Sequence, residues 1–485
     1  MHDLTILIPI NQGIAYRYIL QTDIFKEIQS KAKKIIILVP EPTDPFYENI
    51  KLYNNVIVED YRQAACEKYM NSSKLHKRLK LIRDFVQNGK YDITTTKGHH
   101  DVYIDDFYNK TTPGYKRRFL LWVTNLIIIL ARQSKILRKL ILYLENVLFT
   151  PNIHNDLFIK YQPDSLVVTS MGTFDYDQFF MRQARKHGVK VISVILSWDN
   201  TTTRGYPAAY SDLIIAWTDI MKKELIQLND SDENKIQVGG VALYDTYFNN
   251  EHLYSREELY TKLNINYELD IIFFATKSPN CYASNDYIAK IILEAINNKQ
   301  LVNKCQLLVR LHPIYYRRNN GDLIFSRFID DFNSLQVNYE RLTINKPTIM
   351  STKLNYSMPD DEIKLLASIL KHSSLIINVF SSLNIEASIF DIPIINVSFE
   401  GTIHDDIKKA RYNINQDMNE SHNVRIVNSG GVAMLYQETD LIPFVNEALS
   451  DPSKRKYGRQ NILKKETGPH NGYAGKRIAE MIFDI

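Results

Sequence analysis

The sequence predicts an α/β fold: two doubly wound, Rossmann-like domains facing a cleft, with a helical insertion in the N-terminal half. Short runs of Ile, Val and Leu alternate with helix-length segments, a pattern typical of parallel strands covered by helices on both faces. The alternation stops and then restarts in the second half of the chain, which indicates two such domains. The length agrees, because 485 residues exceed the ~250–300 that one hydrophobic core accommodates.

Seven apolar runs predict the strands of the N-terminal domain. They are residues 4–10, 34–40, 55–60, 165–170, 190–196, 212–218 and 235–240. A helix is expected over 175–188, because Gly188 suits the position that follows a helix end. Residues 61–160 break the alternation with long basic segments and predict a helical insertion or a lid.

Four further runs predict the strands of the C-terminal domain. They are residues 269–277, 305–311, 374–379 and 393–399. A polar stretch between the two groups of strands is expected to connect the domains. These boundaries place an N-terminal domain at 1–245, a linker at 246–268 and a C-terminal domain at 269–455.

Composition and charge narrow the class of protein. Basic residues number 59 and acidic residues 55, a net charge of +4 that does not indicate a nucleic-acid partner. The cysteines Cys66, Cys281 and Cys305 form no C-x-x-C pair, which argues against a disulfide framework or a zinc site. The first residues lack the basic region and the cleavage site of a signal peptide. A cytoplasmic location is therefore expected.

The most hydrophobic stretch, residues 119–131, has basic flanks. Its thirteen residues fall short of the ~20 needed to span a bilayer. Lys116, Arg117 and Arg118 precede it, and four further basic residues follow. Two interpretations stay open: a buried helix with a solvated end, or an interfacial helix in 112–150. The second would give peripheral contact with anionic headgroups on the inner face of the cell membrane.

Candidate binding residues follow from the fold class, because doubly wound sheets bind ligands beyond the carboxyl ends of their strands. The residues at these positions include Gln12, Gly13, Trp198, Asn200, Lys277, His312, Pro313, Ser381 and Ser382. Gly13 would allow a ligand to approach the backbone closely. No G-x-G-x-x-G motif is present, so no dinucleotide cofactor is expected.

The motif "RLHP" (310–313) suggests an anion site. Pro313 ends the strand, because proline cannot donate to the ladder of hydrogen bonds. His312 is then held at the carboxyl end of the strand, where it can donate to a phosphate or a ribose. The alternative is a strand-capping histidine next to a surface arginine, Arg310.

A second motif, "FSSLNIEA" (380–387), suggests the same chemistry. Ser381 and Ser382 open a helix, and the N-terminus of a helix attracts anions. Glu386, about one turn further on, could accept a hydrogen bond from a ribose hydroxyl. Ordinary capping would explain the serines equally well, but both motifs lie at strand ends of one sheet, which favours phosphate binding.

Together these motifs resemble the His-Pro and Ser-Ser elements of GT-B glycosyltransferases that use CMP- or CDP-activated donors. That group includes bacterial polysialyltransferases, Kdo transferases and CDP-glycerol glycerophosphotransferases. Segments 197–245 and 425–482 also look similar to the group, so the resemblance covers about half the chain. It implies a metal-independent transferase of cell-envelope polysaccharide biosynthesis. Such an enzyme moves a sugar or a polyol phosphate to a surface glycan or lipid-linked acceptor.

The resemblance also implies where the substrates bind. The donor would be held by the C-terminal domain, through Lys277, Arg310, His312, Pro313, Ser381, Ser382 and Glu386. The acceptor would be held by the N-terminal domain, through Gln12, Gly13, Trp198 and Asn200. The last helix, within 456–485, is expected to cross back onto the N-terminal domain.

A transfer with inversion needs a base that deprotonates the acceptor hydroxyl. The candidates are Asp199, Asp175 and Asp177, which follow strand ends in the N-terminal half. Asp199 comes first, because the apolar wall of Trp198 could raise its pKa. It could instead form an Asx-turn with Thr201, and Asp175 could simply cap the next helix.

No metal site is predicted. The sequences His99-His100-Asp101 and His404-Asp405-Asp406 contain ligand residue types, but adjacent residues of an extended chain point in opposite directions. Surface loops explain both sequences.

Other functions stay open. One is an isomerase similar to UDP-GlcNAc 2-epimerases, which share the two-domain architecture but usually carry a glycine pair that "SSLNIEA" (381–387) lacks. Another is a transferase that uses a UDP-sugar. A third is a non-catalytic glycan-binding module.

Overall fold

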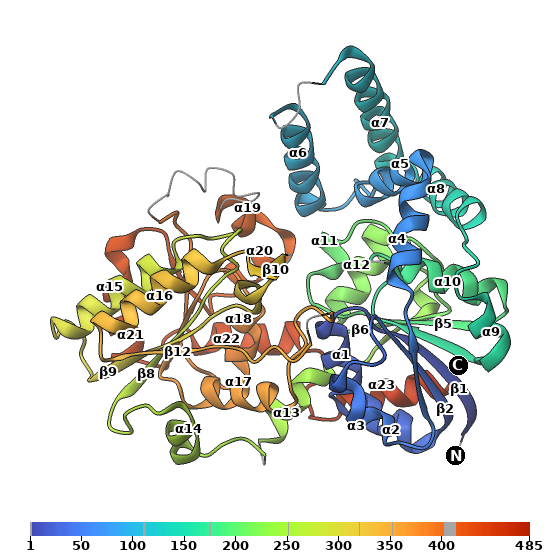
Figure 1. The fold of residues 1–485 in the computed structure, drawn as a ribbon. Coiled ribbons are helices and arrows are strands. Elements are labelled where there is room, and N and C mark those ends of the chain that lie inside the picture. The colour runs from blue at the N-terminus through green and yellow to red at the C-terminus, as the bar shows by residue number, and fades with distance from the viewer. Residues whose placement is uncertain are drawn as a thin grey trace. The chain divides into compact units, whose positions relative to one another are not determined.

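The computed structural model describes residues 2–109, 113–174, 176–250, 252–319, 321–351, 353–401 and 414–485. The chain divides into two compact units (Figure 1). Unit 1 consists of Met1–Ala242, Ser351–Ser357 and Gly468–Ile485, and unit 2 of Leu243–Met350 and Met358–Thr467. Each unit holds one parallel sheet, which confirms the predicted α/β class with two doubly wound domains.

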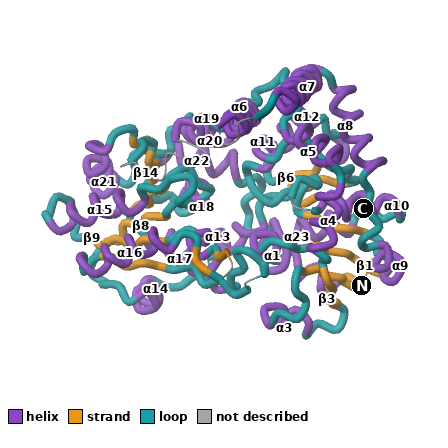
Figure 2. Tube along the Cα trace, turned by 45° about the horizontal axis from the view of Figure 1, so that its top comes forward, coloured by secondary structure: helices purple, strands orange, loops and turns teal. Residues whose placement is uncertain are grey.

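All seven strands predicted for the N-terminal half form the sheet of unit 1, in the order β3-β2-β1-β4-β5-β6-β7. They are β1 (His2–Pro9), β2 (Ala32–Val39), β3 (Val56–Asp60), β4 (Ser165–Val168), β5 (Lys190–Val194), β6 (Leu213–Ala216) and β7 (Ile236–Val238). The runs are continuously apolar because helices cover both faces of the sheet (Figure 2). Ile36 and Val191, for example, have no exposed surface.

Seven helices of the described residues pack on this sheet or lie in the segments that connect its strands. They are α1 (Gly13–Leu20), α2 (Asp23–Lys31), α3 (Glu48–Lys51), α10 (Asp177–Lys186), α11 (Asn200–Thr203), α12 (Asp219–Asn229) and α23 (Ala474–Phe483). Helix α10 is the one expected over 175–188. It ends before Gly188, whose φ of +72° is the left-handed conformation that favours glycine.

Between β3 and β4, the described residues (61–109 and 113–164) form six further helices. They are α4 (Gln63–Ser72), α5 (Lys74–Asp84), α6 (Thr94–Asn109), α7 (Tyr115–Gln133), α8 (Lys135–Leu148) and α9 (Asn155–Tyr161). Ile82, Val86, Ile128 and Ala131 form a small core of their own with Tyr206 of unit 1. Among the described residues, no single helix is long and apolar enough to cross a membrane. Only α7 and α8 together meet those criteria, and the pair is bent by 119°.

The sheet of unit 2 has the order β12-β9-β8-β13-β14-β15. Its strands are β8 (Asp270–Ala275), β9 (Cys305–Arg310), β12 (Leu342–Asn345), β13 (Leu375–Asn378), β14 (Ile394–Val397) and β15 (Ala433–Leu435). The two edge strands, β12 and β15, were not among the predicted strands. Polar residues interrupt β12 (Leu-Thr-Ile-Asn) and β15 has only three residues, so neither shows the apolar run that marks a central strand. A separate hairpin joins β10 (Arg318–Asn319) to β11 (Asp322–Leu323).

Ten α-helices of unit 2 lie in the described part of the chain. They are α13 (Asp245–Asn249), α14 (Arg256–Leu263), α15 (Asn285–Asn297), α16 (Ser326–Asn338), α17 (Asp361–His372), α18 (Leu383–Ile389), α19 (Ile414–Asn419), α20 (Ser421–Val427), α21 (Leu441–Ser450) and α22 (Lys456–Glu466). Residues 246–268, expected to form a linker, contain most of α13 and all of α14. The side chains of Ser255 and Glu258 form a capping box at the start of α14.

The last helix, α23, packs against α2 inside unit 1. Ile478 and Ile482 have no exposed surface. Gly239 and Gly475 allow the close packing, since a Cβ on Gly239 would lie 2.7 Å from Cγ1 of Ile478. Arg477 donates from Nε to the carbonyl oxygen of Gly239 at 3.1 Å. This helix is therefore part of the core of unit 1.

We expect Ile478→Ala to lower the free energy of unfolding of unit 1 by about 2–5 kcal/mol, the usual cost of a buried cavity. All three tryptophans, Trp122, Trp198 and Trp217, lie in unit 1, so denaturation followed by tryptophan fluorescence reports on this unit. Ile159→Ala is the matched control within unit 1, because Ile159 is 61% exposed on α9. Equal stability of the two variants would contradict the role given to α23.

Candidate functional site

The order of strands in unit 2 creates a switch point between β8 and β13. The chain runs from β8 through β9 to β12 on one side of β8, and from β13 through β14 to β15 on the other. Doubly wound sheets bind ligands at this crevice, beyond the carboxyl ends of the strands. Ile272 of β8 pairs with Leu307 of β9 and Leu375 of β13, so the three strands end close together.

Four of the predicted donor-binding residues follow these three strands. Lys277 follows β8, His312 follows β9, and Ser381 with Ser382 follows β13. A hydrogen bond connects the ends of β8 and β9, because the backbone N–H of His312 donates to Oγ1 of Thr276 at 2.9 Å. The structure thus brings Lys277, His312 and the paired serines to neighbouring strand ends of one sheet.

The imidazole of His312 is exposed and is held by the backbone after it. Its Nδ1 accepts a hydrogen bond from the N–H of Ile314 at 3.1 Å, which caps the short 3₁₀ helix Pro313–Tyr316. Pro313 suits the first position of this helix, because its missing N–H would have no partner there. With Nδ1 accepting, the neutral ring carries its proton on Nε2.

His312 is therefore a neutral donor. Neighbouring protein atoms and then the charge of Lys277 lower the pKa of His312. A neutral ring at physiological pH offers Nε2–H to an outside acceptor such as a phosphate oxygen.

Lys277 is largely buried beside the same strand ends. Its Nζ forms an ion pair with Asp417 of α19, and the two side chains are only 15% and 10% exposed. Burial raises the pKa of Asp417, and the attraction of Lys277 opposes that rise. Asn285 fixes the turn, because its Nδ2 donates to the carbonyl oxygen of Lys277 at 3.1 Å and its Oδ1 accepts from the N–H of Lys277 at 2.9 Å.

The paired serines are partly exposed and begin α18. The Oγ of Ser381 accepts from the N–H of Leu383 at 3.3 Å. Phe380, just before them, has φ of +38°, a conformation that is uncommon for residues other than glycine. Oδ1 of Asn396 on β14 holds this turn by accepting from the N–H of Phe380 at 2.8 Å.

Glu386 does not present its carboxylate to a ligand. It is 8% exposed, accepts from Oγ of Ser382 at 3.1 Å, and accepts from the hydroxyl of Tyr247 at 2.6 Å. This corrects the expectation of a ribose contact, because the carboxylate joins α18 to α13 within unit 2.

Arg310 is also used inside the domain. Its guanidinium is buried, donates to Oε2 of Glu362 on α17 at 2.5 Å, and donates to the side chain of Asn345 on β12. A surface or donor-facing arginine was expected. Instead the side chain joins β9 to its neighbour β12 and to α17.

The sheet of unit 1 has its own switch point, between β1 and β4. Gln12 and Gly13 follow β1, and Ser170 follows β4. Gly13 does approach another backbone closely, but that backbone belongs to the chain itself. Its N–H donates to the carbonyl oxygen of Asn355 at 2.7 Å, and an added Cβ would lie 2.3 Å from the nitrogen of Ser357. Residues 355–357 therefore occupy the space next to the Cα of Gly13 where a ligand was expected.

Asp177 is an internal carboxylate. It is 2% exposed, and Ser170 donates to its Oδ2 at 2.7 Å. The same hydroxyl accepts from the N–H groups of Gly172 and Phe174, at 3.1 and 3.2 Å. Asp177 therefore fixes the loop after β4, and Asp175 lies outside the described residues.

Asp199 is partly exposed at the loop that follows β5. Ser197 donates to its Oδ1 at 2.5 Å and Thr203 to its Oδ2 at 3.0 Å. Trp198 beside it is 6% exposed, and Asn200 is buried with its Oδ1 accepting from the N–H of Ser197 at 3.1 Å. Of the two described aspartates, Asp199 has the more accessible carboxylate.

The metal-ligand residue types do not gather in the described part of the chain. No group of three or more His, Cys, Asp or Glu side chains there could hold an ion. His100 is buried, with its Nε2 3.1 Å from Oδ1 of Asn125 and its Nδ1 3.4 Å from a guanidinium nitrogen of Arg132. His404, Asp405 and Asp406 lie outside the described residues.

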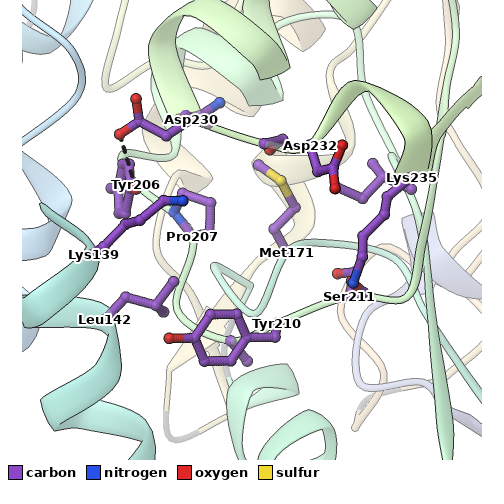
Figure 3. Close-up of a pocket in the computed structure, with 14 residues that line it drawn as sticks. Lys139, Leu142, Met171, Tyr206, Pro207, Tyr210, Ser211, Asp230, Asp232 and Lys235 are labelled. Atoms are coloured by element: carbon purple, nitrogen blue, oxygen red, sulfur yellow. Dashed lines mark hydrogen bonds between the residues drawn. The ribbon is translucent and has the colours of Figure 1, made fainter. Parts of the chain in front are cut away.

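A separate cavity of about 280 Å³ lies in unit 1 (Figure 3). Lys139 and Leu142 of α8 line it together with Met171, Tyr210 and Lys235. It does not include the strand-end candidates of either unit. Sequence reasoning also missed Thr276, Asn285, Asn396 and Asp417, which hold the strand ends of unit 2; only Asn396, a polar residue in an apolar run, left a signal.

No family model matches the chain, and no curated protein matches it significantly. Solved structures do match. The UDP-GlcNAc 2-epimerase of Methanocaldococcus jannaschii is 15% identical, with a TM-score of 0.52 over 100% of both chains. The chain shares its fold. The UDP-GlcNAc 2-epimerase of Neisseria meningitidis, solved with UDP-GlcNAc bound, is 11% identical, with a TM-score of 0.52 over 99% of this chain and 100% of that chain.

A glycosyltransferase of Rickettsia africae matches at 12% identity, with a TM-score of 0.48 over 100% of this chain and 98% of that chain. The two epimerases, at 15% and 11% identity, show a shared fold and no more, and nothing is argued from the match to the transferase. The reaction has to be argued from the residues of the site.

We expect Gly13→Ala to destabilise unit 1 by about 1–3 kcal/mol, the usual cost of overpacking, because the new Cβ would meet backbone atoms that cannot rotate away. Tryptophan fluorescence in a denaturant titration measures the loss. Gly98→Ala is the control, because nothing lies within 4 Å of a Cβ at Gly98 and alanine suits a helix interior better than glycine. If Gly13→Ala were as stable as Gly98→Ala, the contact with residues 355–357 would not constrain this position.

Proposed function

We propose that the protein is a glycosyltransferase of cell-envelope polysaccharide biosynthesis. It moves a sugar or polyol phosphate from a nucleotide-activated donor to a surface glycan or a lipid-linked acceptor. The observation that carries the proposal is the group formed by Lys277, His312 and Ser381 with Ser382 at the switch point of unit 2. The Nε2–H of His312 and the hydroxyl of Ser381 match the acceptor oxygens of a nucleotide phosphate, and Lys277 would add positive charge when the phosphate takes the place of Asp417.

The neutral state of His312 suits the chemistry. In transfer of a sugar, the acceptor oxygen bonds to the anomeric carbon while the bond from that carbon to the phosphate oxygen breaks, and the nucleotide phosphate leaves with the electron pair. In transfer of a polyol phosphate, the acceptor oxygen bonds to the phosphorus of that group while the P–O bond of the diphosphate breaks, and the nucleoside monophosphate leaves with the electron pair. Negative charge therefore grows on the leaving phosphate, where a donor that is already in place stabilises the transition state most. The hydrogen bond from Ile314 to Nδ1 fixes such a donor, because it keeps the ring proton on Nε2.

The acceptor hydroxyl must lose its proton to a base. The resemblance to GT-B transferases gives this role to the N-terminal domain, and Asp199 is the candidate there. Its partly exposed carboxylate is held in place by Ser197 and Thr203. Gln12, Trp198 and Asn200 are the proposed acceptor-binding residues around it and at the end of β1.

The motifs favour cytidine as the base of the donor, whereas the likeness in fold to an epimerase solved with UDP-GlcNAc supports uridine. We retain cytidine as the proposal. A thermal-shift panel of CMP-, CDP-, UDP- and GDP-linked ligands tests it, since a ligand at ~100 times its Kd adds about 2.7 kcal/mol of stability. Stronger stabilisation by UDP than by CMP or CDP would reverse the choice.

An epimerase is the second candidate, because the solved epimerases match this fold over the full length. An epimerase needs no acceptor, so UDP-GlcNAc alone would be converted to UDP-ManNAc. Appearance of that product would replace the transferase proposal. A transferase requires a second substrate before the nucleotide is released.

We expect His312→Ala to weaken nucleotide binding by roughly 1–3 kcal/mol, the range for a lost hydrogen bond to a charged group. His312→Asn separates the two functions of the ring. Its Oδ1 can still accept from the N–H of Ile314, but the outward Nε2 donor is gone. Titration calorimetry with the best nucleotide of the panel provides the measurement.

Both variants should bind more weakly than the exposed control, His252→Ala. If only His312→Ala were weakened, the ring would act through the cap of the 3₁₀ helix and not through a nucleotide contact. Unchanged affinity in both variants would remove the central argument for the donor site.

We expect Asp199→Asn to lower turnover about 10²–10⁴-fold with little change in nucleotide affinity, because the substitution keeps the shape and removes the proton acceptor. Asp219→Asn, at an exposed position on α12, is the control. Near-normal turnover of Asp199→Asn would shift the role to Asp175 or Asp177. If all three asparagine variants stayed active, a retaining mechanism or another reaction class would be favoured.

A further inference from the structure

Helices α7 and α8 expose an unusual amount of apolar surface. Thirty large apolar or aromatic side chains are exposed in the described part of the chain, and fourteen of them lie in 115–148. Those fourteen are Tyr115, Phe119, Leu120, Trp122, Leu126, Ile127, Ile129, Leu130, Ile136, Leu137, Leu140, Tyr143, Val147 and Leu148. Exposed apolar surface that gathers in one place marks an interaction site.

Helix α8 exposes a stripe of apolar side chains, although its inner face buries Ile141 and Leu142 as a core helix would. Ile136, Leu140, Tyr143 and Val147 follow one another at helical spacing and are 80%, 45%, 55% and 59% exposed. The inner face also buries two charged side chains, Arg138 and Glu145, which are 2% and 0% exposed. Water alone would favour burial of the apolar stripe and exposure of the charges.

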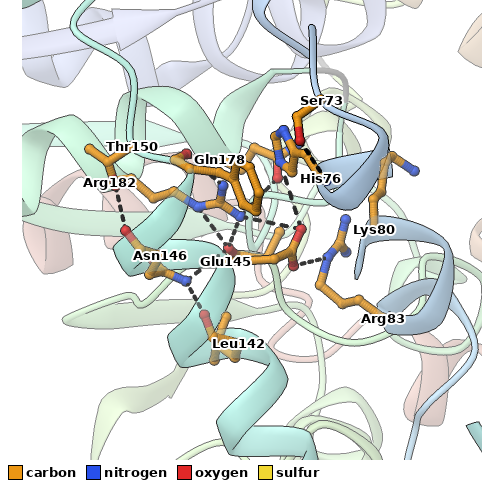
Figure 4. A network of polar contacts seen from close by, with 12 residues as sticks. Ser73, His76, Lys80, Arg83, Leu142, Glu145, Asn146, Thr150, Gln178 and Arg182 are labelled. Carbon is orange, nitrogen blue, oxygen red and sulfur yellow. Dashed lines mark hydrogen bonds and ion pairs between the residues drawn. The ribbon is translucent and has the colours of Figure 1, made fainter. Parts of the chain in front are cut away.

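The buried charges fasten α8 to the rest of unit 1 (Figure 4). Glu145 forms an ion pair with Arg83 of α5, with 2.8 Å between Oε2 and Nε, and a longer one with Arg182 of α10 at 3.7 Å. His76 stands 3.8 Å from the same carboxylate. Burial and then the charges of Arg182 and Arg83 lower the pKa of His76 to about 4, so its ring adds no third positive charge.

A second buried pair fixes the corner between the two helices. Arg138 donates to both carboxylate oxygens of Asp230, at 2.6 and 3.0 Å. Its Nη1 donates to the carbonyl oxygens of Ala131 and Arg132, at 2.9 Å each, at the end of α7. The bend and the direction of the apolar face are therefore set by the fold.

The exposed charges of this pair of helices are all basic. Lys116, Arg117 and Arg118 are exposed in the first turn of α7, and Lys135 and Lys139 on α8. The one acidic residue of both helices, Glu145, is buried. Cations at a helix N-terminus oppose the helix dipole, so the first turn of α7 is costly unless anions approach it.

From these observations we propose that α7 and α8 form an interfacial anchor that inserts its apolar face into a bilayer of anionic phospholipids. The bent pair would lie in the membrane surface, with its basic residues against the lipid phosphates. A second copy of the chain would instead bring two positive faces together, which charge opposes. The proposal does not depend on the reaction catalysed.

Vesicle binding tests the anchor. The full chain should sediment with vesicles of phosphatidylglycerol and phosphatidylcholine at low salt, bind pure phosphatidylcholine vesicles far less, and be released at high salt. Trp122 gives an internal signal, because it is 60% exposed whereas Trp198 and Trp217 are 6% and 4% exposed. Its emission should shift to the blue on binding, and Trp122→Phe should remove the shift.

Two variants separate the contributions. Replacing both Lys116 and Arg117 with Gln should weaken binding to the anionic vesicles about 30-fold, from two surface charges. Phe119→Ser with Ile129→Ser should weaken binding at every salt concentration. Val337→Ser, an exposed apolar position on α16, should bind like the unchanged protein. Thermal unfolding checks that each variant is folded.

Failure of the unchanged protein to bind anionic vesicles at low salt would overturn the proposal. Equal binding by the Phe119→Ser, Ile129→Ser variant would overturn it as well. The alternative is that a second copy of the chain covers the apolar face, and light scattering tests it by measuring the mass of the protein in solution. A dimer that this variant converts to a monomer, without vesicle binding by either form, would show that a second copy covers the face.

Discussion

In each unit, all strands of the sheet point the same way, and every candidate residue depends on this constraint. Because the strands are parallel, their carboxyl ends all lie at the same edge of the sheet. In unit 2, β8 lies between β9 and β13, so Lys277, His312 and the serines at 381 and 382 come to neighbouring positions despite their distance in the sequence. The side chains could not be grouped in this way by an antiparallel sheet with the same residues.

This constraint also explains which strands and which site residues could be predicted from the sequence alone. Central parallel strands are apolar throughout, so their ends, and with them the positions of Lys277 and His312, could be predicted. Strands β12 and β15 could not, because β12 reads Leu-Thr-Ile-Asn and β15 has only three residues, so neither carries an unbroken apolar run. Asp417 was out of reach for another reason: its contact with Lys277 comes from a helix more than a hundred residues later.

Arg310 and Glu386 show why residue type and position were insufficient for the rest of the site. Both were expected to face the donor, and both are buried in ion-pair or hydrogen-bond partnerships with Glu362 and Tyr247. A charged side chain in a domain interior needs a partner, and the sequence does not say which one is in reach. The hydrophobic stretch 119–131 raises the same difficulty, since its composition and basic flanks left both a buried helix and an interfacial helix open.

The contact between Gly13 and residues 355–357 has a consequence for how the chain is made. Unit 1 is discontinuous: its sheet is complete by residue 242, but it also requires Ser351–Ser357 and Gly468–Ile485. On the ribosome, the first half emerges with the surface of α2 and the turn at Gly13 uncovered until nearly the whole polypeptide has been synthesised. The two units are thus not separable modules at the genetic level, since no single cut of the reading frame yields unit 1 intact.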